Sequence, residues 1–345
     1  MKIIHTADIH LDSPLAGVKQ STARRNELIQ ALQRLAQYAE NNGVKAVVVA
    51  GDLFDDKCAT IQTIKSVASI IDGSSATWFV LRGNHGDSTP YDKLQSYCSK
   101  VMMFGSDWTY YQYGNLCVCG RELGQNDQQQ WNNLQLDGNN FNLVVLHGDV
   151  DSDQYGLIDK QAVSRQPINY LALGHRHSYA QHKMGKVTAV YSGVLESRGF
   201  DEAEQSGFVV IDTDTGKHQF VEQSIRRVVT VTVDVTKAQS NVQLQNIIND
   251  AICGVSPNNY LNLVLQGTLS EDISLQFVVE QISGGFFAFR LQDDTTVAYD
   301  IEQLAAEISL RGEFVRLVQR TITDKNAQEE ALKLGLRALK GEELL

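Results

Sequence analysis

Aspartate, asparagine and histidine recur in this chain at the ends of five short apolar stretches: IIHTADIH, AVVVAGDLFD, WFVLRGNH, LVVLHGD and LALGHRH. Five of the eight histidines stand at these ends. Carboxylate or amide oxygen combined with imidazole nitrogen suits manganese, iron or zinc better than calcium. The pattern therefore predicts a metal centre. Its candidate ligands are Asp8, His10, Asp52, Asn84, His147, His175 and His177.

Seven ligands, with one carboxylate shared, are about enough for two divalent ions. Two ions roughly 3.5–4 Å apart recur at sites of in-line displacement at phosphorus, where they lower the pKa of an attacking water. Taken singly, each stretch has a structural alternative. GDLFD can cap a helix, GNHG can form a turn, and a lone buried histidine is usually part of a core. Their recurrence at strand ends favours metal-dependent hydrolysis of a phosphoester.

The elements that must position these residues begin as strand, helix, strand, helix, strand. Apolar spacing predicts a helix over 21–42 and a second over 60–72, between β-branched strands. We expect parallel strands of one sheet to bring their carboxyl ends to one edge. Residues two apart, such as Asp8 and His10, should point the same way on extended backbone.

From about residue 100 the strands follow one another more closely, which favours a more antiparallel end to the first domain. The pattern resets near QSIRRVVTVTVDV, so we expect domains at 1–225 and 226–345. The second reads as a smaller α+β domain with three strands, two intervening helices and further helices at its end. No GxxxxGK[ST] phosphate loop occurs in the sequence.

Charge and cysteine content narrow the function classes. The net charge is −11, divided as −6 and −5 between the two expected domains, so neither coats DNA phosphates by charge alone. Five cysteines without a CxxC pair favour reduced thiols and a cytoplasmic protein. The first apolar run is too short for a signal peptide, and no run approaches the length of a membrane span.

The motifs D-x-H, GD-x-x-D, GNH, a strand-borne H and GH-x-H, in this order, resemble the calcineurin-like metallophosphoesterases. TADIHLDSPLAG, LRGNH, LALGHRHS and YSGVLESRGFDE resemble the SbcD-type DNA repair exonucleases, most of all their YhaO-like branch. The resemblance is dense over residues 1–225 and looser beyond. It implies an α/β fold, a calcineurin-like four-layer β-sandwich flanked by helices, with a smaller C-terminal α+β capping domain.

The resemblance also implies roles for individual residues. One metal would take Asp8, His10, Asp52 and His177, and the other Asp52, Asn84, His147 and His175, with Asp52 bridging. Manganese is expected, with iron or zinc as alternatives. His85 would face the scissile phosphate and protonate the leaving oxygen, while Asp55 would orient His85. The family usually has Asp or Glu directly after this histidine, but Gly86 stands here, so the placement of His85 is open.

The resemblance implies a two-metal nuclease of DNA repair, acting as an exonuclease or an endonuclease. The alternatives are a phosphodiesterase or phosphatase for nucleotides or other small phosphoesters, and a non-catalytic scaffold. DNA and an SMC-like coiled-coil ATPase, docked through the C-terminal helices, are the implied partners, and a homodimer is left open. Arg82, Arg176 and Arg198 are candidates to contact phosphate, with surface ion pairing as the alternative.

Overall fold

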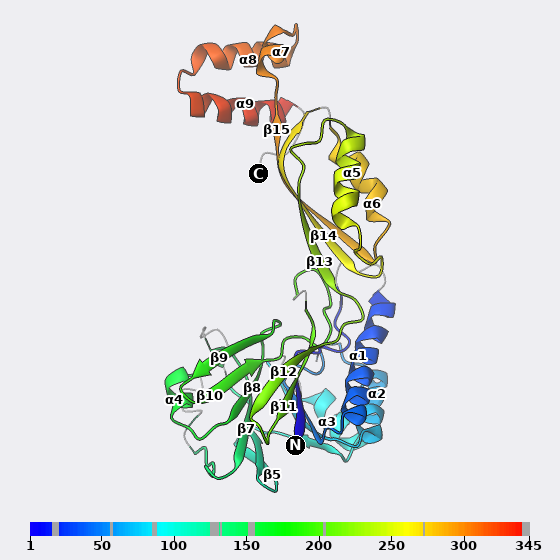
Figure 1. Cartoon of the computed structure of the whole chain (residues 1–345), viewed down its shortest axis with the longest axis vertical. Coiled ribbons are helices and arrows are strands. Elements are labelled where there is room, and N and C mark those ends of the chain that lie inside the picture. The colour runs from blue at the N-terminus through cyan, green and yellow to red at the C-terminus, as the bar shows by residue number, and fades with distance from the viewer. Residues whose placement is uncertain are drawn as a thin grey trace. The chain divides into compact units, whose positions relative to one another are not determined.

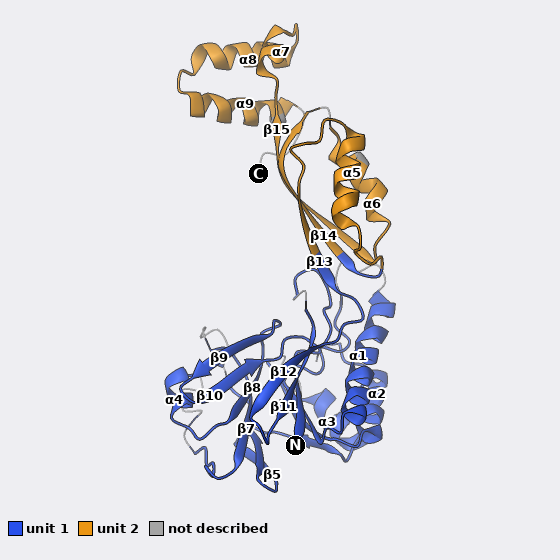
Figure 2. Cartoon of the chain, viewed as in Figure 1, with its two compact units in different colours: residues 1–229, 258–260 blue, residues 230–257, 261–345 orange. Residues whose placement is uncertain are grey.

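The computed structural model describes residues 1–15, 21–55, 58–84, 88–124, 131, 133–150, 156–202, 205–271 and 273–339. The chain divides into two compact units, which Figure 2 shows in different colours. Unit 1 comprises Met1–Val229 together with Asn258–Tyr260, and unit 2 comprises Thr230–Pro257 and Leu261–Leu345. The sequence placed the domain boundary after residue 225, and the short return of Asn258–Tyr260 to unit 1 had no signal in the sequence.

The first sheet of unit 1 has the strand order β12-β11-β1-β2-β3-β4. β1 to β4 are parallel, and β11 and β12 add antiparallel strands at one edge. The strands are β1 (Lys2–Thr6), β2 (Ala46–Ala50), β3 (Thr77–Leu81), β4 (Val101–Met103), β11 (Gly207–Asp212) and β12 (Lys217–Glu222).

The parallel strands are joined by α1 (Ser21–Asn41), α2 (Ile61–Gly73) and α3 (Thr89–Tyr97). The first two lie close to the predicted ranges. α2 begins where the Thr60 hydroxyl accepts a hydrogen bond from the Thr63 amide at 3.2 Å, which satisfies a donor that the first turn leaves open. The helices of these crossovers cover one face of the first sheet. In a parallel sheet that is covered on both faces, the central strands are apolar on both sides.

The second sheet has the order β5-β6-β7-β8-β10-β9. Its strands are β5 (Thr109–Tyr113), β6 (Leu116–Gly120), β7 (Phe141–His147), β8 (Tyr170–Gly174), β9 (Ala180–Met184) and β10 (Val187–Tyr191), and α4 (Lys160–Ser164) lies between β7 and β8. The expectation of a more antiparallel end to this unit holds only at the sheet edges: β5, β9, β11 and β12 pair antiparallel, whereas β6, β7, β8 and β10 are parallel. The pairs β6–β7 and β7–β8 are joined by long crossovers, as parallel pairing requires, and short spacing elsewhere does not fix strand direction.

Three apolar cores make the layers of unit 1. One core lies between the sheets and includes Ile3 and Val48 with Leu143 and Tyr170. A second packs α1, α2 and α3 on the outer face of the first sheet. A third covers the outer face of the second sheet and includes Val163 of α4. These layers confirm the predicted α/β fold of a two-sheet sandwich flanked by helices.

Unit 2 follows the predicted order of elements. Its sheet, β13-β14-β15, packs against α5 and α6, as Figure 1 shows (β13 Val228–Asp234, α5 Asn241–Ile252, β14 Tyr260–Ser270, α6 Leu275–Ser283, β15 Ala288–Ala298). α7 (Ile301–Ala306), α8 (Leu310–Thr321) and α9 (Lys325–Leu339) share a separate core. None of the helices in the described part of the chain combines the length and apolar character needed to cross a membrane.

Candidate metal centre

The predicted ligands come from two sheets rather than from one. Asp8, Asp52 and Asn84 follow β1, β2 and β3 of the first sheet, whereas His147 ends β7 of the second and His175 follows β8. The expectation that one sheet delivers them all to one edge was therefore incomplete. Both sheets have parallel centres, so the carboxyl ends of their strands can meet across the sandwich.

The backbone at these positions is not extended, which corrects the expectation that Asp8 and His10 align along a strand. β1 ends at Thr6, and Asp8 and His10 have φ of 51° and 46°. Asp52 has φ of 50° and His175 has φ of 100°. Positive φ is uncommon for residues other than glycine and costs on the order of 1–3 kcal/mol at each position. Such strain gathers at functional sites, where the surrounding structure holds it in place.

Two glycines allow the close approach of these segments. A Cβ on Gly83 would lie 1.7 Å from Oδ1 of Asp52. A Cβ on Gly51, which has φ of 104°, would lie 2.0 Å from Nδ1 of His147. Any side chain at either position would therefore displace a predicted ligand, so the two glycines are part of what confines Asp52 and His147.

Two overlapping clusters of ligand atoms result, one from Asp8, His10 and His177 and one from Asp8, Asp52 and His147. Within each, the ligand atoms all lie within 4.8 Å of one another. The Nε2 atoms of His10 and His177 are 3.3 Å apart. Oδ2 of Asp52 lies 3.3 Å from Nε2 of His147 and 3.8 Å from Nε2 of His10. Asp8 belongs to both clusters and Asp52 lies beside a histidine of each, whereas the sequence assigned a bridging role to Asp52 alone.

The two remaining predicted ligands adjoin the clusters. Oδ1 of Asn84 lies 2.8 Å from Nε2 of His147. The ring of His175 meets the ring of His147 edge-on, with 5.4 Å between centroids. The backbone amide of His175 donates to both carboxylate oxygens of Asp8 at 3.1 Å. The ring of His175 belongs to neither cluster in the described residues.

Burial and neighbouring charge move several of these pKa values. Burial raises the pKa of Asp8 to about 7. Burial alone would lower the pKa of His147, but its hydrogen bond to Asp52 and the charges of Asp52 and Asp8 raise it to about 9. Burial and the neighbouring His147 lower the pKa of His175. A buried carboxylate favours its charged form only when positive charge stands beside it, and a divalent ion would supply that charge.

The donor set fits two divalent ions. Asp8, His10, Asp52 and His147 are each at most 2% exposed. Their oxygen and imidazole donors suit borderline metals. Manganese stays a prediction, because these donors serve iron and zinc as well.

The predicted catalytic pair can be placed only in part. His85, like Gly86, lies outside the described residues. Asp55 is half-buried, and its amide donates to the carbonyl oxygen of Leu11 at 2.9 Å. This bond belongs to a bridge between the segments that follow β1 and β2, which carries Asp55 alongside the ligand-bearing backbone. The orientation of His85 by Asp55 stays a prediction.

The three arginines proposed to contact phosphate lie in ion pairs with carboxylates of unit 1. These pairs are partly buried, and contact of the three arginines with phosphate stays a prediction. The pairs are Arg82 with Glu122 (Oε2 at 2.5 Å), Arg176 with Asp149 (2.6 Å) and Arg198 with Glu202 (Nε to Oε1, 2.7 Å).

Glu202 had been assigned no function from the sequence. Its Oε1 lies 3.2 Å from Nδ1 of His177, and its side chain is 8% exposed. Its only signal was its position in the stretch SRGFDE, which resembles the nuclease branch. A lone glutamate in a polar loop is usually solvated, so the sequence could not single it out.

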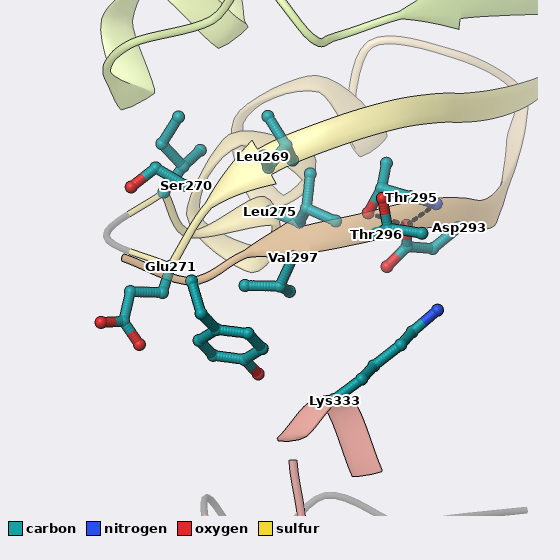
Figure 3. A pocket seen from close by; sticks show the side chains of 11 residues that line it. Leu269, Ser270, Glu271, Leu275, Asp293, Thr295, Thr296, Val297 and Lys333 are labelled. Atoms are coloured by element: carbon teal, nitrogen blue, oxygen red, sulfur yellow. Dashed lines mark hydrogen bonds between the residues drawn. The ribbon is translucent and has the colours of Figure 1, made fainter. Parts of the chain in front are cut away.

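A pocket of about 380 Å³ lies in unit 2, and none of its described lining residues is a predicted site residue (Figure 3). Glu271, Asp293 and Lys333 line it, with hydroxyl groups that include Thr295. The Thr295 amide and hydroxyl both donate to Asp293, at 3.0 and 2.7 Å, so this carboxylate is engaged in a turn. No histidine or cysteine occurs in its described lining, so its chemistry differs from that of the metal centre.

A match to a known protein family agrees with the geometry of this site. The family model for calcineurin-like phosphoesterases matches residues 1–193. The chain therefore belongs to the calcineurin-like phosphoesterase family, whose members normally bind two divalent metals.

Named relatives include a Bacillus subtilis protein, the uncharacterized metallophosphoesterase YhaO, with 23% identity over 79% of this chain and 73% of YhaO. The DNA double-strand break repair protein Mre11 of Methanosarcina acetivorans is 26% identical over 61% of this chain, which corresponds to 36% of that protein. Among solved structures, an archaeal phosphodiesterase is similar to 65% of this chain and all of its own, with 13% identity and a TM-score of 0.40.

Proposed function

We propose that the chain is a two-metal phosphodiesterase that cleaves DNA during repair. The observation that carries the proposal is the meeting of Asp8, His10, Asp52, His147 and His177 in two overlapping clusters with Asn84 at their side. Bound in pairs, divalent ions stabilise the charge that develops on a phosphoryl group during in-line attack. The similarity to Mre11 proteins supports DNA as the substrate.

Contacts within the chain fix the orientation of the predicted metal ligands. Nδ1 of His147 lies 2.9 Å from the carbonyl oxygen of Ala50, so its proton is held there and Nε2 is directed toward Asp52 and Asn84. Asp8 and Asp52 supply the negative charge that would hold the cations. His85 is the predicted proton donor to the leaving oxygen.

The alternative is a nucleotide or another small phosphoester as substrate. The net charge of −11 supports it, as do the ion pairs that engage Arg82, Arg176 and Arg198. A long polyanion gains affinity from many cationic contacts, whereas a small phosphoester needs few. A non-catalytic scaffold is the third candidate, and the filled ligand positions argue against it.

We also propose that unit 2 caps the nuclease domain and that its last helices dock a coiled-coil ATPase of SMC type. Apolar exposure supports docking: Ile308 is fully exposed, Leu310 is 73% exposed and Leu317 is 47% exposed. Ile308 precedes α8 and both leucines lie on it, and an exposed apolar patch is typical of a protein interface. A homodimer stays a prediction.

The test compares Mn²⁺-dependent cleavage of linear, circular and single-stranded DNA with hydrolysis of nucleotides and bis-p-nitrophenyl phosphate. We expect DNA cleavage that His147→Ala abolishes and that His85→Ala strongly reduces. His218→Ala is the matched control, because His218 lies on β12 and contacts Gln181 at 3.1 Å. Turnover of small substrates alone would favour the alternative, and bound metal without any hydrolysis would favour the scaffold.

A further inference from the structure

His177 is held through both of its ring nitrogens. Nε2 faces Nε2 of His10 at 3.3 Å, inside one ligand cluster. Nδ1 faces Oε1 of Glu202 at 3.2 Å. An imidazole that binds a metal through one nitrogen usually donates the proton of the other to a carboxylate or a carbonyl. With that proton on Nδ1, the lone pair of Nε2 is directed toward the cluster.

Glu202 is itself fixed by Arg198. The backbone amide of Arg198 donates to Oε2 at 2.6 Å, and its Nε donates to Oε1 at 2.7 Å. Both carboxylate oxygens are therefore held by Arg198, and Oε1 is placed where it can accept the proton of Nδ1 of His177.

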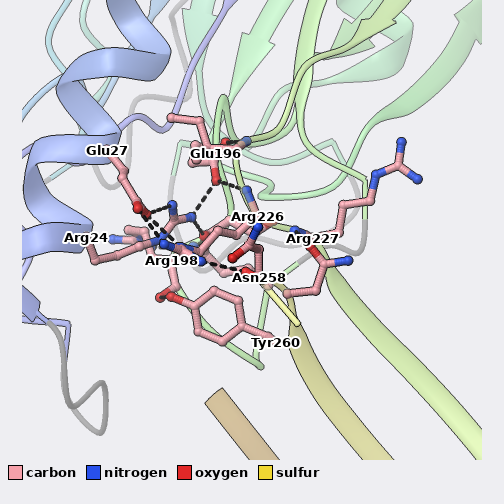
Figure 4. Close-up of polar contacts among 12 residues, drawn as sticks. Arg24, Glu27, Glu196, Arg198, Arg226, Arg227, Asn258 and Tyr260 are labelled. Carbon is pink, nitrogen blue, oxygen red and sulfur yellow. Dashed lines mark hydrogen bonds and ion pairs between the residues drawn. The ribbon is translucent and has the colours of Figure 1, made fainter. Parts of the chain in front are cut away.

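The segment that carries this pair is anchored at its other end. Glu196, which is 2% exposed, accepts from the backbone amides of Ile225 and Arg226 at 2.7 and 3.0 Å and from the guanidinium of Arg24 at 2.5 Å (Figure 4). The hydroxyl of Tyr260 donates to the carbonyl oxygen of Arg198 at 3.3 Å. Both contacts restrain the loop, so Glu202 is presented to the histidine in a defined position.

The equivalent contact of His147 is of a different kind. Its Nδ1 lies 2.9 Å from the carbonyl oxygen of Ala50, which is a neutral acceptor. A carboxylate acceptor makes the opposite nitrogen a stronger donor to a metal than a carbonyl does. We therefore expect the two histidines to bind their ions with unequal strength.

We propose that Glu202 is a positioning residue that fixes the ring and strengthens the metal affinity of His177, with Arg198 holding Glu202 in place. The inference rests on the proposed two-metal function of this site. It concerns one cluster, that of Asp8, His10 and His177, and leaves the cluster of His147 unchanged.

The test is calorimetric titration of Mn²⁺ into the metal-stripped full chain. We expect Glu202→Ala to weaken one of two bound ions by about 10–100-fold and to leave the other unchanged. Glu202→Gln keeps an acceptor oxygen without its charge, so its loss should be smaller. Glu222→Gln is the matched control, since Glu222 pairs with Arg227 at 2.6 Å and contacts no predicted ligand.

Nitrogen-15 spectra of the histidine rings with Zn²⁺ bound give a second readout. We expect a proton on Nδ1 of His177 in the wild type and in Glu202→Gln, and loss of that single protonation pattern in Glu202→Ala. Two unchanged affinities in a folded Glu202→Ala protein would overturn the inference and leave the proposed function intact. A wild type that binds no metal would overturn both. If Glu202→Ala does not fold, the isosteric Glu202→Gln decides by the same titration.

Discussion

Unit 1 buries two clusters of charged side chains that obtain their positive charge in different ways. Around Glu196 and Glu27, the complement is the guanidinium groups of Arg24 and Arg226, each within 3 Å of a carboxylate oxygen (Figure 4). At the metal centre, Asp8 and Asp52 face imidazoles instead. Arginine stays charged at every relevant pH, whereas the charge of histidine depends on pH and on its neighbours.

The difference explains what each cluster does. The cluster of Arg24, Glu27, Glu196 and Arg226, here called the arginine cluster, contains both signs of charge. It therefore links α1, the loop before β11 and the start of the connection to unit 2 without any ligand. The metal centre concentrates carboxylates on strained backbone beside nitrogens that are good metal ligands. Cations from solution complete it. The two clusters should therefore respond in opposite ways to the same kind of substitution.

The largest effect is expected for Asp8→Asn, because Asp8 belongs to both ligand clusters. Asparagine keeps the shape and an acceptor for the amide of His175, so the fold should persist. We expect both Mn²⁺ ions to be lost, and hydrolysis of bis-p-nitrophenyl phosphate to fall by more than the roughly 100-fold typical of a lost outer contact.

Titration calorimetry and the hydrolysis rate measure this effect. Asp212→Asn is the control, because Asp212 is 40% exposed and pairs with the N-terminal amine. If Asp8→Asn still bound two ions tightly, the carboxylate of Asp8 would not be needed to bind cations, and the contrast with the arginine cluster would be wrong.

The next effect is on stability. Glu196→Gln keeps the shape of the arginine cluster but leaves the buried guanidinium of Arg24 without a full counter-charge. Breaking a buried pair in this way costs about 3–5 kcal/mol, and we expect the free energy of unfolding of unit 1 to fall by that amount in urea. The number of bound ions should stay at two.

Glu222→Gln is the matched surface variant in the same unit. Glu222 pairs with Arg227 at 2.6 Å, and the side chain of Arg227 is 56% exposed, so the pair contributes at most about 1 kcal/mol. An equal, small effect of both substitutions would show that the arginine cluster is not the stabilising one.

The pH dependence of the metal-free protein separates the clusters further. The folded pKa of Asp8, about 7, lies above its ordinary 3.8, so its contribution to stability is present below pH 3.8 and is lost as pH rises through 7. The folded pKa of His147, about 9, lies above 6.5, so its contribution is lost between pH 6.5 and 9. Both losses have the same sign.

We expect metal-free stability to fall and Mn²⁺ affinity to rise over this range, because metals bind carboxylates and neutral imidazoles. Denaturant unfolding of the wild type and of Asp8→Asn, each from pH 4 to 9, measures the first trend. As pH rises, the free energy of unfolding of Asp8→Asn should increase relative to that of the wild type. A difference that does not change with pH would contradict the raised pKa of Asp8.

Much of the fold could be predicted because its signals are local. Apolar spacing predicted the helix now seen as α1, and β-branched runs predicted β2 and β3. Strand direction in the second sheet was missed, since it depends on which strands pair rather than on any one strand. The return of Asn258–Tyr260 to unit 1 depends on Tyr260 packing beside Arg24, a contact between residues far apart in the chain.

The candidate ligands could be named from residue type and position at strand ends, but their geometry could not. The left-handed backbone at Asp8 and His10 is set by hydrogen bonds to the segment after β2, from the Asp8 amide to Gly51 and from the His10 amide to Asp52. Glu202 was missed for the same reason: its contact with His177 is tertiary. Residue types predict which chemistry is available, and long-range contacts decide how it is arranged.

The smallest effect tests how tightly that arrangement is confined. Gly83→Ala would place a Cβ 1.7 Å from Oδ1 of Asp52, so the carboxylate or its backbone must move. We expect a loss of about 1–3 kcal/mol in stability, as for other overpacked sites, together with weaker Mn²⁺ binding. Gly73→Ala is the matched control at the end of α2, where a Cβ meets nothing within 4 Å and should be neutral or stabilise by up to about 1 kcal/mol. Urea unfolding and Mn²⁺ titration of both variants decide the point, since a Gly83→Ala protein that matched Gly73→Ala in both would show that Asp52 is free to move at the metal centre.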